Sequence, residues 1–477
     1  MSFVLAVEKV VPASLGRHLL PFAAIADSIL YAGDDRSVSR RIAMFSFAVR
    51  VLSGVIAYLT QVLLARWMGD FEYGVLVVVW VGAVLVGGLA CLGFQTAILR
   101  FVPQYIERGE VGLLRGVIIG SRLQGFLAAT LFAVIGATGL YYFGDHLQSY
   151  YLIPLFLGAV TLPMMAIAEL QDGLSRAFNW ADLSLWPTYV VRPMLVLLFM
   201  WIAVHEGARP DAITGMATVI AATYVTSIGQ LLMLERRVRK AVPRGPRDYA
   251  PAQWMAISLP IFVVEGLFNL LTNIDIMMVG HFAEPDQVAI YYAAAKTMVL
   301  LHFVYYAVKA GSAQRFSQYY ASGDRRQLAT FLRDTIHWTF WPTLALAAFL
   351  LVFGKPLLLF FGPTFGAGYP LLYILAAGII VRASIGPAEI LLAMAGQQGI
   401  AAVVYVATFV VNVTLNVVLI PRYGLTGAAF AMSLSLVVET AALYTLIATR
   451  LGLHCSIFTA FAPLRFAPAA IEAPRHG

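Results

Sequence analysis

The chain contains few charged residues for its length. Of its 477 residues only 12% are Asp, Glu, Lys or Arg, whereas 60% are hydrophobic and the mean hydropathy is +0.81. An average soluble domain has about 25% charged residues, which form its hydrated surface. The composition therefore excludes a soluble multidomain protein and predicts a membrane protein with several spans.

Cysteine is scarce as well, with Cys91 inside a hydrophobic run and Cys455 near the carboxyl end. Two such distant cysteines provide neither a disulfide framework nor a metal site. The sequence also lacks a P-loop, a G-x-S-x-G motif and a cluster of metal ligands. We therefore predict no enzyme activity, no metal and no cofactor. An integral-membrane polysaccharide polymerase or ligase is the enzyme alternative, but it would need a large outward loop and the predicted loops are short.

Hydrophobic runs dominate what is present. From Arg41 onward, runs of about 20 residues, each long enough for ~30 Å of hydrocarbon, alternate with short polar connections. The predicted fold class is an all-α integral membrane protein with about twelve transmembrane helices. The predicted spans are 42–65, 74–99, 116–142, 150–170, 183–204, 213–234, 255–281, 288–312, 335–353, 369–395, 397–420 and 424–448.

Lysine and arginine gather in the loops on one side of the predicted helices. Only four of them fall in the loops on the opposite side, namely Arg66, Arg209, Lys355 and Arg422. Because positively charged loops stay in the cytoplasm, we predict that both termini are cytoplasmic. The same distribution accounts for the net charge of +7, so we do not predict nucleic-acid binding.

Three polar segments lie outside the predicted helices. Residues 1–40 form an amino-terminal tail without a convincing cleavage site, so we predict a cytoplasmic or interfacial tail and no signal peptide. Residues 235–254 form a basic cytoplasmic linker that we expect to lie near anionic lipid headgroups. Residues 449–477 form a cytoplasmic tail at the carboxyl end.

The two halves of the sequence repeat each other. The pattern Gln104-Tyr105-x-x-x-Gly109-Glu110 recurs as Gln318-Tyr319-x-x-x-Gly323-Asp324, each time in the loop that follows the second helix of a half. This repeat predicts two six-helix lobes, 41–234 and 255–448. Because each half has an even number of helices, the repeats run parallel and are related by an axis along the membrane normal. Two such lobes can enclose a central cavity that opens alternately to either side.

Several basic residues fall deep inside predicted spans. Arg50, Arg192, Lys296 and Arg382 lie too far from the helix ends to reach water easily, whereas Arg122 is close enough to an end to do so and is a weaker candidate. A charge at this depth is costly, so it faces a cavity or a partner. We expect the four to line the cavity and bind an anionic passenger such as a pyrophosphate headgroup.

Acidic residues inside the spans offer an alternative role for these cations. In that alternative the cations are only neutralised, by Glu265, Asp275, Glu389 and Glu439. Glu389 follows Arg382 by seven residues and therefore lies on the same helix face; it is also a weaker candidate for lining the cavity.

The predicted span 255–281 carries one polar face. Asn269 and Asn273 lie close to Glu265 around the helix, and Asp275 lies at the edge of this face. We expect the face to line the cavity, with Asn269 and Asn273 as weaker candidates for contact with the passenger. Glu265 and Asp275 are the candidates for coupling transport to H⁺ or Na⁺. The alternative is that these polar side chains only hold helices together.

Motifs in a fixed order give the chain a family resemblance from residue 41 to about 448. These motifs are Leu64-Ala65-Arg66-x-x-Gly69-x-x-x-Tyr73-Gly74, Ser258-Leu259-Pro260 with Asp275 and Gly280, Tyr291 or Tyr292 followed by Ala293 to Ala295, Gln318-Tyr319 with Gly323-Asp324, and Asn412-x-x-x-Asn416 followed by Pro421-x-x-Gly424-x-x-Gly427-Ala428. The chain resembles the Wzx-type polysaccharide-biosynthesis flippases of the multidrug/oligosaccharidyl-lipid/polysaccharide exporter superfamily. Its amino-terminal extension departs from that pattern.

The resemblance implies a V-shaped pair of six-helix lobes in the bacterial inner membrane. Such a protein moves undecaprenyl-pyrophosphate-linked oligosaccharides to the outer leaflet for O-antigen, capsule or exopolysaccharide synthesis, driven by an ion gradient. Arg50, Arg192, Lys296 and Arg382 would then hold the substrate. Membrane lipids and the polysaccharide polymerase and export machinery are the implied partners. The multidrug and toxin extrusion branch is the transport alternative, although several deep bases suit cationic drugs poorly.

Overall fold

All regular secondary structure in the part of the chain that the structure describes is helical. The computed structural model describes the backbone of residues 35–458 and the side chains from residue 52 onward, apart from those of Ala310 and Gln398. The longer helices are α3 Asp35–Ala90, α4 Phe94–Glu107, α5 Val111–Phe143, α6 Ser149–Ala177, α7 Ala181–Trp186, α8 Arg192–His205, α9 Ala212–Ala241, α10 Pro251–Phe282, α11 Pro285–Ala321, α12 Arg325–Leu359, α13 Tyr369–Ala383, α14 Ala388–Met394 and α15 Gln398–Leu446.

Ten helical segments of the described chain are long and apolar enough to cross a membrane, and two of these are double. The first, α3, turns at Gly69, where φ is 79°, and α15 turns at Gly424, where φ is 57°. A positive φ strains any residue with a Cβ atom, so glycine suits both turns. Each turn reverses the chain, and ten segments with two reversals give the twelve transmembrane helices predicted from the sequence.

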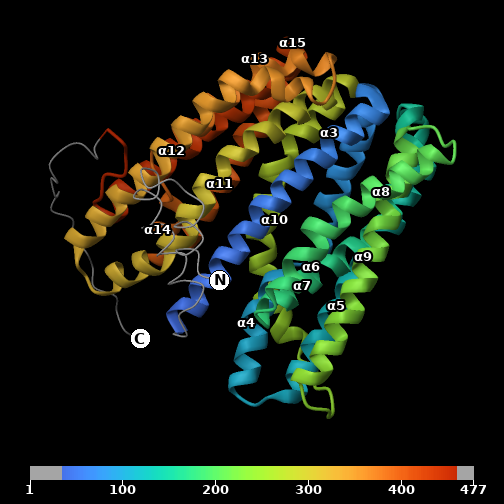
Figure 1. Cartoon of the computed structure of the whole chain (residues 1–477). Coiled ribbons are helices and arrows are strands. Elements are labelled where there is room, and N and C mark those ends of the chain that lie inside the picture. Colours follow the sequence, from blue (N-terminus) through green and yellow to red (C-terminus); the bar gives the residue numbers. More distant parts are fainter. Residues whose placement is uncertain (1–34, 459–477) are drawn as a thin grey trace, which may run out of the picture.

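The helices form two arms that meet at one end and separate toward the other (Figure 1). Helices α4 to α9 make up one arm and α11 to α15 the other, while α3 and α10 lie between them. The pairing of α3 with α11 and of α10 with α3 and α4 joins the two halves of the chain. The bounds of the two lobes, 41–234 and 255–448, stay a prediction from the internal repeat.

Helix α10 passes from one arm to the other. Near its start Trp254 donates a hydrogen bond of 2.9 Å to the Tyr105 hydroxyl on α4. Near its end Asp275 accepts hydrogen bonds from α15. Glycine lets the two halves of the chain approach closely beside α10, because a Cβ atom on Gly74 would lie 1.7 Å from the carbonyl oxygen of Pro285. Small residues at such interfaces are typical of membrane helices.

Two predicted spans are interrupted in the structure. The span 74–99 is broken at Cys91–Gly93, where Leu92 and Gly93 have φ values of 49° and 78°. The span 369–395 is broken between α13 and α14 at Gly386, where φ is 60°. Hydropathy is high on both sides of each turn, so it does not reveal the break.

The polar segments are partly helical. Within the predicted linker 235–254, α9 continues to Ala241 and α10 begins at Pro251, so 242–250 form the connection. Of the predicted amino-terminal tail, residues 1–34 lie outside the described part of the chain. Of the carboxyl-terminal tail, Cys455 and Ile457 are buried against the second arm, and residues 459–477 lie outside the described part.

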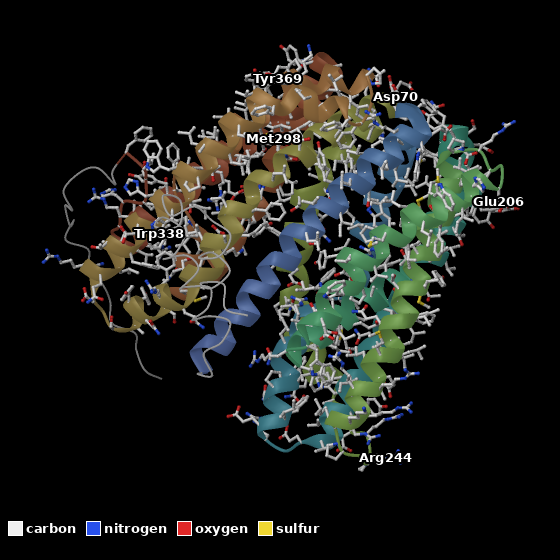
Figure 2. The ribbon with its side chains drawn as sticks, in the orientation of Figure 1. Asp70, Glu206, Arg244, Met298, Trp338 and Tyr369 are labelled. Carbon is white, nitrogen blue, oxygen red and sulfur yellow. The ribbon has the colours of Figure 1, made fainter. Side chains whose placement is uncertain are left out.

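A hydrophobic core fills the junction of the arms. The largest hydrophobic cluster lies there and includes Tyr73, Tyr292, Phe361 and Phe365, all nearly inaccessible to solvent. Figure 2 shows Asp70, Glu206 and Tyr369 at this closed end and Arg244 at the opposite end. The fold is therefore sealed at one end, and it separates toward the end that carries the basic linker.

Candidate functional site

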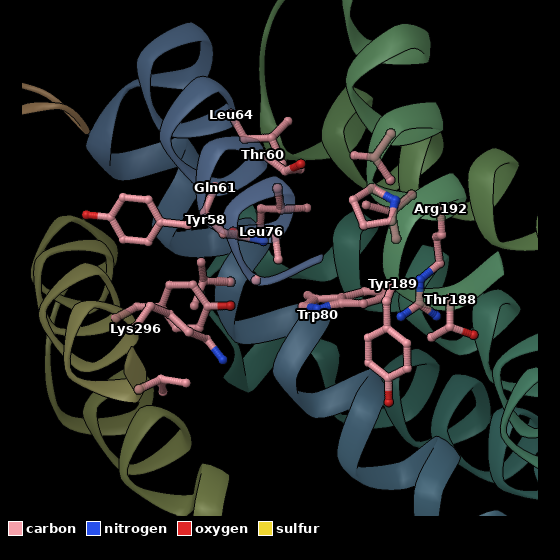
Figure 3. Close-up of a pocket in the computed structure, with 18 of the residues that line it drawn as sticks. Tyr58, Thr60, Gln61, Leu64, Leu76, Trp80, Thr188, Tyr189, Arg192 and Lys296 are labelled. Atoms are coloured by element: carbon pink, nitrogen blue, oxygen red, sulfur yellow. The ribbon is translucent and has the colours of Figure 1, made fainter. Parts of the chain in front are cut away.

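A cavity of about 320 Å³ lies below the closed end, between the two arms. Both halves of the chain line it: Tyr58, Gln61 and Trp80 come from α3, and Arg192 from α8. Helix α11 completes the wall. Figure 3 shows Lys296 on α11 at one side of this space and Arg192 with Trp80 at the other. Two of the four cations predicted from the sequence thus line one cavity.

Arg192 is placed by an irregular turn. The span that carries it consists of α7, a π-helical turn at Pro187–Val191 and α8, and the Arg192 amide donates to the carbonyl of Pro187, five residues earlier. Such wide turns often mark functional sites because they redirect side chains. The Arg192 guanidinium carbon lies 5.4 Å from the centroid of the Trp80 ring. No described carboxylate lies within ion-pair distance of Arg192.

Lys296 has a similar environment on the opposite wall. Its ammonium nitrogen lies 4.9 Å from the centroid of the Tyr292 ring, one turn earlier on α11. Within the described part of the chain it makes no ion pair and no hydrogen bond. The two cavity cations therefore each contact an aromatic ring, and neither forms an ion pair within the described part of the chain.

Arg382 lies elsewhere, inside the second arm. Its guanidinium donates to Glu389 at 2.6 Å and to Glu439 at 2.9 Å, and these three side chains are only 9–13% exposed. It also donates to the carbonyl of Gly386 at 3.1 Å, and Lys309 lies 4.0 Å from Glu389. This geometry matches the alternative in which glutamates neutralise the arginine. Neither Arg382 nor Glu389 lines the cavity.

Glu265 lies where α10 contacts the first arm. Its carboxylate accepts a hydrogen bond of 2.8 Å from Gln95, and a second one from Thr96, at the start of α4. On the same face, Asn273 donates to the backbone and side-chain oxygens of Asn269, one turn earlier. Within the described chain, the polar face of α10 is thus bonded to its neighbours and to itself. None of the three residues lines the cavity.

Asp275 is buried between α10 and α15. It accepts hydrogen bonds of 3.0 Å from Asn412 and 2.7 Å from Asn416, and no lysine or arginine of the described chain pairs with it. The side-chain oxygen of Asn416 is buried and has no donor within the described part of the protein. Asp275 therefore combines a buried carboxylate with a second buried oxygen that has no partner.

Of the two remaining candidate cations, Arg122 lies away from the cavity. Arg122 on α5 is 11% exposed and lies 3.4 Å from Glu235 on α9, so it pairs with an acid near the end of the arm. Arg50 lies on α3, but its side chain is outside the described residues.

The aromatic wall of the cavity was not predicted from the sequence. Tyr58, Trp80 and Tyr292 lie in hydrophobic runs and are indistinguishable there from core residues. Glu169 on α6, the carboxylate that interacts electrostatically with Arg192, was also not predicted. Glu169 falls at the edge of the predicted span 150–170, so the depth rule that singled out the four bases passes over it.

Two family models match the chain. The model described as polysaccharide biosynthesis protein matches residues 40–312, which is more than half of the chain. The model described as MatE matches residues 260–418. The two matches overlap between residues 260 and 312 and together extend over most of the twelve helices.

Individual proteins with similar sequence or structure are transporters. A probable low-salt glycan biosynthesis flippase of Haloferax volcanii, Agl15, is 23% identical over 427 residues, which cover 88% of this chain and 83% of that protein. The inward-facing structure of a multidrug resistance MATE family transporter has a TM-score of 0.72 at 12% identity and covers 84% of this chain and 94% of its own. The lipid II flippase MurJ, in an inward closed conformation, has a TM-score of 0.64 at 13% identity, with coverages of 85% and 88%.

Proposed function

Because the chain belongs to the polysaccharide biosynthesis protein family, we propose that it flips undecaprenyl-pyrophosphate-linked oligosaccharides across the inner membrane for the synthesis of a surface polysaccharide. It has the fold of the multidrug/oligosaccharidyl-lipid/polysaccharide exporter superfamily, and it is a membrane transporter and not an enzyme. The O-antigen, a capsule or an exopolysaccharide would be the product that depends on it.

The observation that carries the proposal is the pair of cations that line the cavity and form no ion pair within the described chain. Arg192 comes from one half of the chain and Lys296 from the other, and neither has a carboxylate partner among the described residues. A guanidinium binds phosphate through paired hydrogen bonds, and an ammonium adds a point charge. A pyrophosphate between them would contact both lobes at once. An anion that bridges the lobes can favour one arrangement of the arms over the other.

The charge of the cavity also separates the two transport alternatives. A multidrug exporter that takes cationic compounds would have to place them beside Arg192 and Lys296, where like charges repel. The described lining of the cavity contains no Asp or Glu that could offset this repulsion. We therefore favour the anionic lipid-linked substrate over a cationic drug.

Asp275 and Glu265 remain the candidates for ion coupling. Asp275 is the better placed, because its carboxylate is buried with amide partners only and the Asn416 oxygen beside it has no donor in the described chain. A buried carboxylate with a nearby neutral oxygen can bind H⁺ or Na⁺ when access alternates. Glu265 contacts α4 through Gln95 and Thr96 and would respond to movement between α10 and the first arm.

We further propose an orientation with both termini in the cytoplasm. The arms separate at the end that carries the basic linker, which the distribution of lysine and arginine assigns to the cytoplasm (Figures 1 and 2). In this orientation the described state is inward-facing, and the substrate enters from the side where it is made. A polysaccharide polymerase and export machinery would act on the flipped product.

The test is a gene deletion followed by measurement of lipid-linked oligosaccharide in the inner membrane. We expect undecaprenyl-linked repeat units to accumulate in the deletion strain. The wild-type gene should relieve the accumulation, whereas Arg192→Ala and Lys296→Ala should not. Arg192→Lys and Lys296→Arg are the matched controls, because they keep the charge.

An unchanged pool of lipid-linked oligosaccharide, combined with new sensitivity to cationic drugs, would overturn the proposal and assign the protein to drug export. If lipid-linked oligosaccharide accumulates in the deletion strain and both alanine variants relieve the accumulation as well as wild type does, the result would support flipping but reject the cationic site. Immunoblots of the membrane fraction establish that each variant is present at the wild-type level.

A further inference from the structure

Each cation of the cavity lies over the face of an aromatic ring. The guanidinium carbon of Arg192 is 5.4 Å from the centroid of Trp80, and the ammonium nitrogen of Lys296 is 4.9 Å from that of Tyr292. The electron-rich face of a ring attracts a cation, and it does so without accepting the hydrogen bonds that a carboxylate would accept. Both cations are thus fixed in place while their N–H donors stay available.

Arg382 shows what happens when carboxylates are added to the same kind of contact. Its guanidinium lies 5.6 Å from the centroid of Tyr305, yet Glu389 and Glu439 also bind it. Its charge is fully offset, and little of its side chain is accessible. An aromatic contact alone and an aromatic contact with carboxylates therefore leave an arginine with different capacities to bind a further anion.

One carboxylate of the described chain acts on Arg192 through its charge. Glu169 on α6 interacts electrostatically with Arg192 but makes no ion pair or hydrogen bond with any described residue. If the indole of Trp80 were absent, the flexible arginine side chain could turn toward this carboxylate. An ion pair with Glu169 would then reduce the positive charge that faces the cavity.

We propose that Trp80 and Tyr292 are positioning residues for the transport substrate: they hold Arg192 and Lys296 by their ring faces and keep both cations free to bind one anionic group between the lobes. This inference rests on the proposed function, because it assumes that the cavity takes a pyrophosphate-bearing substrate. It adds that the aromatic wall, and not the cations alone, determines the affinity for the anion.

The experiment measures the binding of inorganic pyrophosphate to the purified full chain in lipid nanodiscs by isothermal titration calorimetry. Trp80→Leu and Tyr292→Leu remove the ring faces, and each should weaken binding roughly three- to thirty-fold, the effect of losing one cation–π contact. Trp80→Phe should retain most of the affinity, because phenylalanine also offers a ring face. Thermal unfolding of each variant shows that the protein remains folded.

A second variant separates positioning from a packing defect. Trp80→Leu combined with Glu169→Gln removes both the ring and the competing carboxylate, so binding should recover most of the loss. A variant that merely disturbs packing would not be rescued by a change on α6. Tyr305→Leu is the matched control: it removes the ring beneath Arg382, which its two glutamates hold in place, and should leave pyrophosphate binding unchanged.

The outcomes distinguish this inference from the proposed function. If the wild-type protein binds pyrophosphate and Trp80→Leu and Tyr292→Leu bind it equally well, the positioning role is overturned while the anion site stands. Failure of the wild-type protein to bind pyrophosphate, or binding that survives Arg192→Ala with Lys296→Ala, would overturn the anion site and with it this inference. Loss in Trp80→Leu without recovery in the double variant would reject Glu169 as the competing partner and overturn the competition between ring and carboxylate for Arg192.

Discussion

Two sets of cations within the membrane-spanning helices of this protein differ in their partners. Arg192 and Lys296, in the cavity between the arms, contact aromatic rings and have no carboxylate partner in the described chain. Arg382, inside the second arm, is bound by Glu389 and Glu439. All three lie deep in predicted spans and are equivalent in the sequence. Depth in a membrane helix therefore identifies a residue with a special role, whereas its partner determines which role.

The largest effect should come from breaking the neutralised cluster. Arg382→Met leaves two buried glutamates without their arginine, and removing one partner of a buried ion pair costs about 3–5 kcal/mol. We expect a loss of that size in the free energy of unfolding, measured in detergent. Glu389→Gln and Glu439→Gln added to Arg382→Met should recover most of it. Wild-type stability in the single variant would contradict a structural role for the cluster.

The cavity cations should show the opposite pattern. Arg192→Ala and Lys296→Ala should each lower flipping of the lipid-linked substrate roughly ten- to hundred-fold, because a hydrogen bond to a charged group contributes about 1.5–3 kcal/mol. Their stability should stay close to wild type, since neither residue is ion-paired with a described carboxylate that its loss would leave unpaired. The measurements are transport in reconstituted vesicles and thermal unfolding. A variant that is less stable than wild type but transports normally per folded molecule would show that the cavity cation has a structural role, which is the opposite of this prediction.

Asp275 tests a buried charge of the opposite sign. Asp275→Leu removes an acceptor shared by Asn412 and Asn416 and should cost about 1–3 kcal/mol, the penalty for an unsatisfied buried donor. Asp275→Asn should lower the free energy of unfolding less than Asp275→Leu does. It should, however, abolish the dependence of transport on an imposed ion gradient. The matched control is Asp275→Asn combined with Asn412→Asp, which keeps one carboxylate in the site. Gradient-dependent transport by Asp275→Asn would remove Asp275 from the coupling mechanism.

The smallest effect is expected for an ion pair exposed to solvent. Arg237 and Asp182 pair near one end of the first arm, with side chains 40% and 48% exposed. An exposed pair contributes about 0–1 kcal/mol, so Arg237→Ala should change the free energy of unfolding by no more than this. The contrast with Arg382→Met isolates burial as the variable. A larger loss in Arg237→Ala would indicate a role for that arginine beyond the pair.

The sequence predicted the fold more completely than the site. Hydrophobic runs indicated twelve helices, because a helix must be apolar over its whole length to cross the hydrocarbon. The turns at Cys91–Gly93 and Gly386 were missed because hydropathy averages over them. Among the four deep bases, Arg192 and Lys296 line the cavity, Arg382 does not, and the side chain of Arg50 is outside the described residues.

The aromatic partners show where sequence reasoning ends. Nothing in the spacing along the chain connects Trp80 with Arg192, because they lie on different helices, α3 and α8. Tyr292 lies four residues before Lys296, so that pair could have been proposed from helical spacing. Charge and depth are properties of single positions, whereas a cation–π contact between helices is a property of their packing.

The sequence by itself determined that the chain spans a membrane, how many helices do so, and that its two halves repeat, because each property follows from local composition or from comparison of the chain with itself. Only the tertiary structure decided which charges are neutralised and which face the cavity. The packing of α13 and α14 on α15 brings Glu389 and Glu439 to Arg382, while the approach of α8 to α3 gives Arg192 a tryptophan. The physical reason is that the energy of a buried charge depends on atoms within a few ångströms, which distant parts of the chain supply.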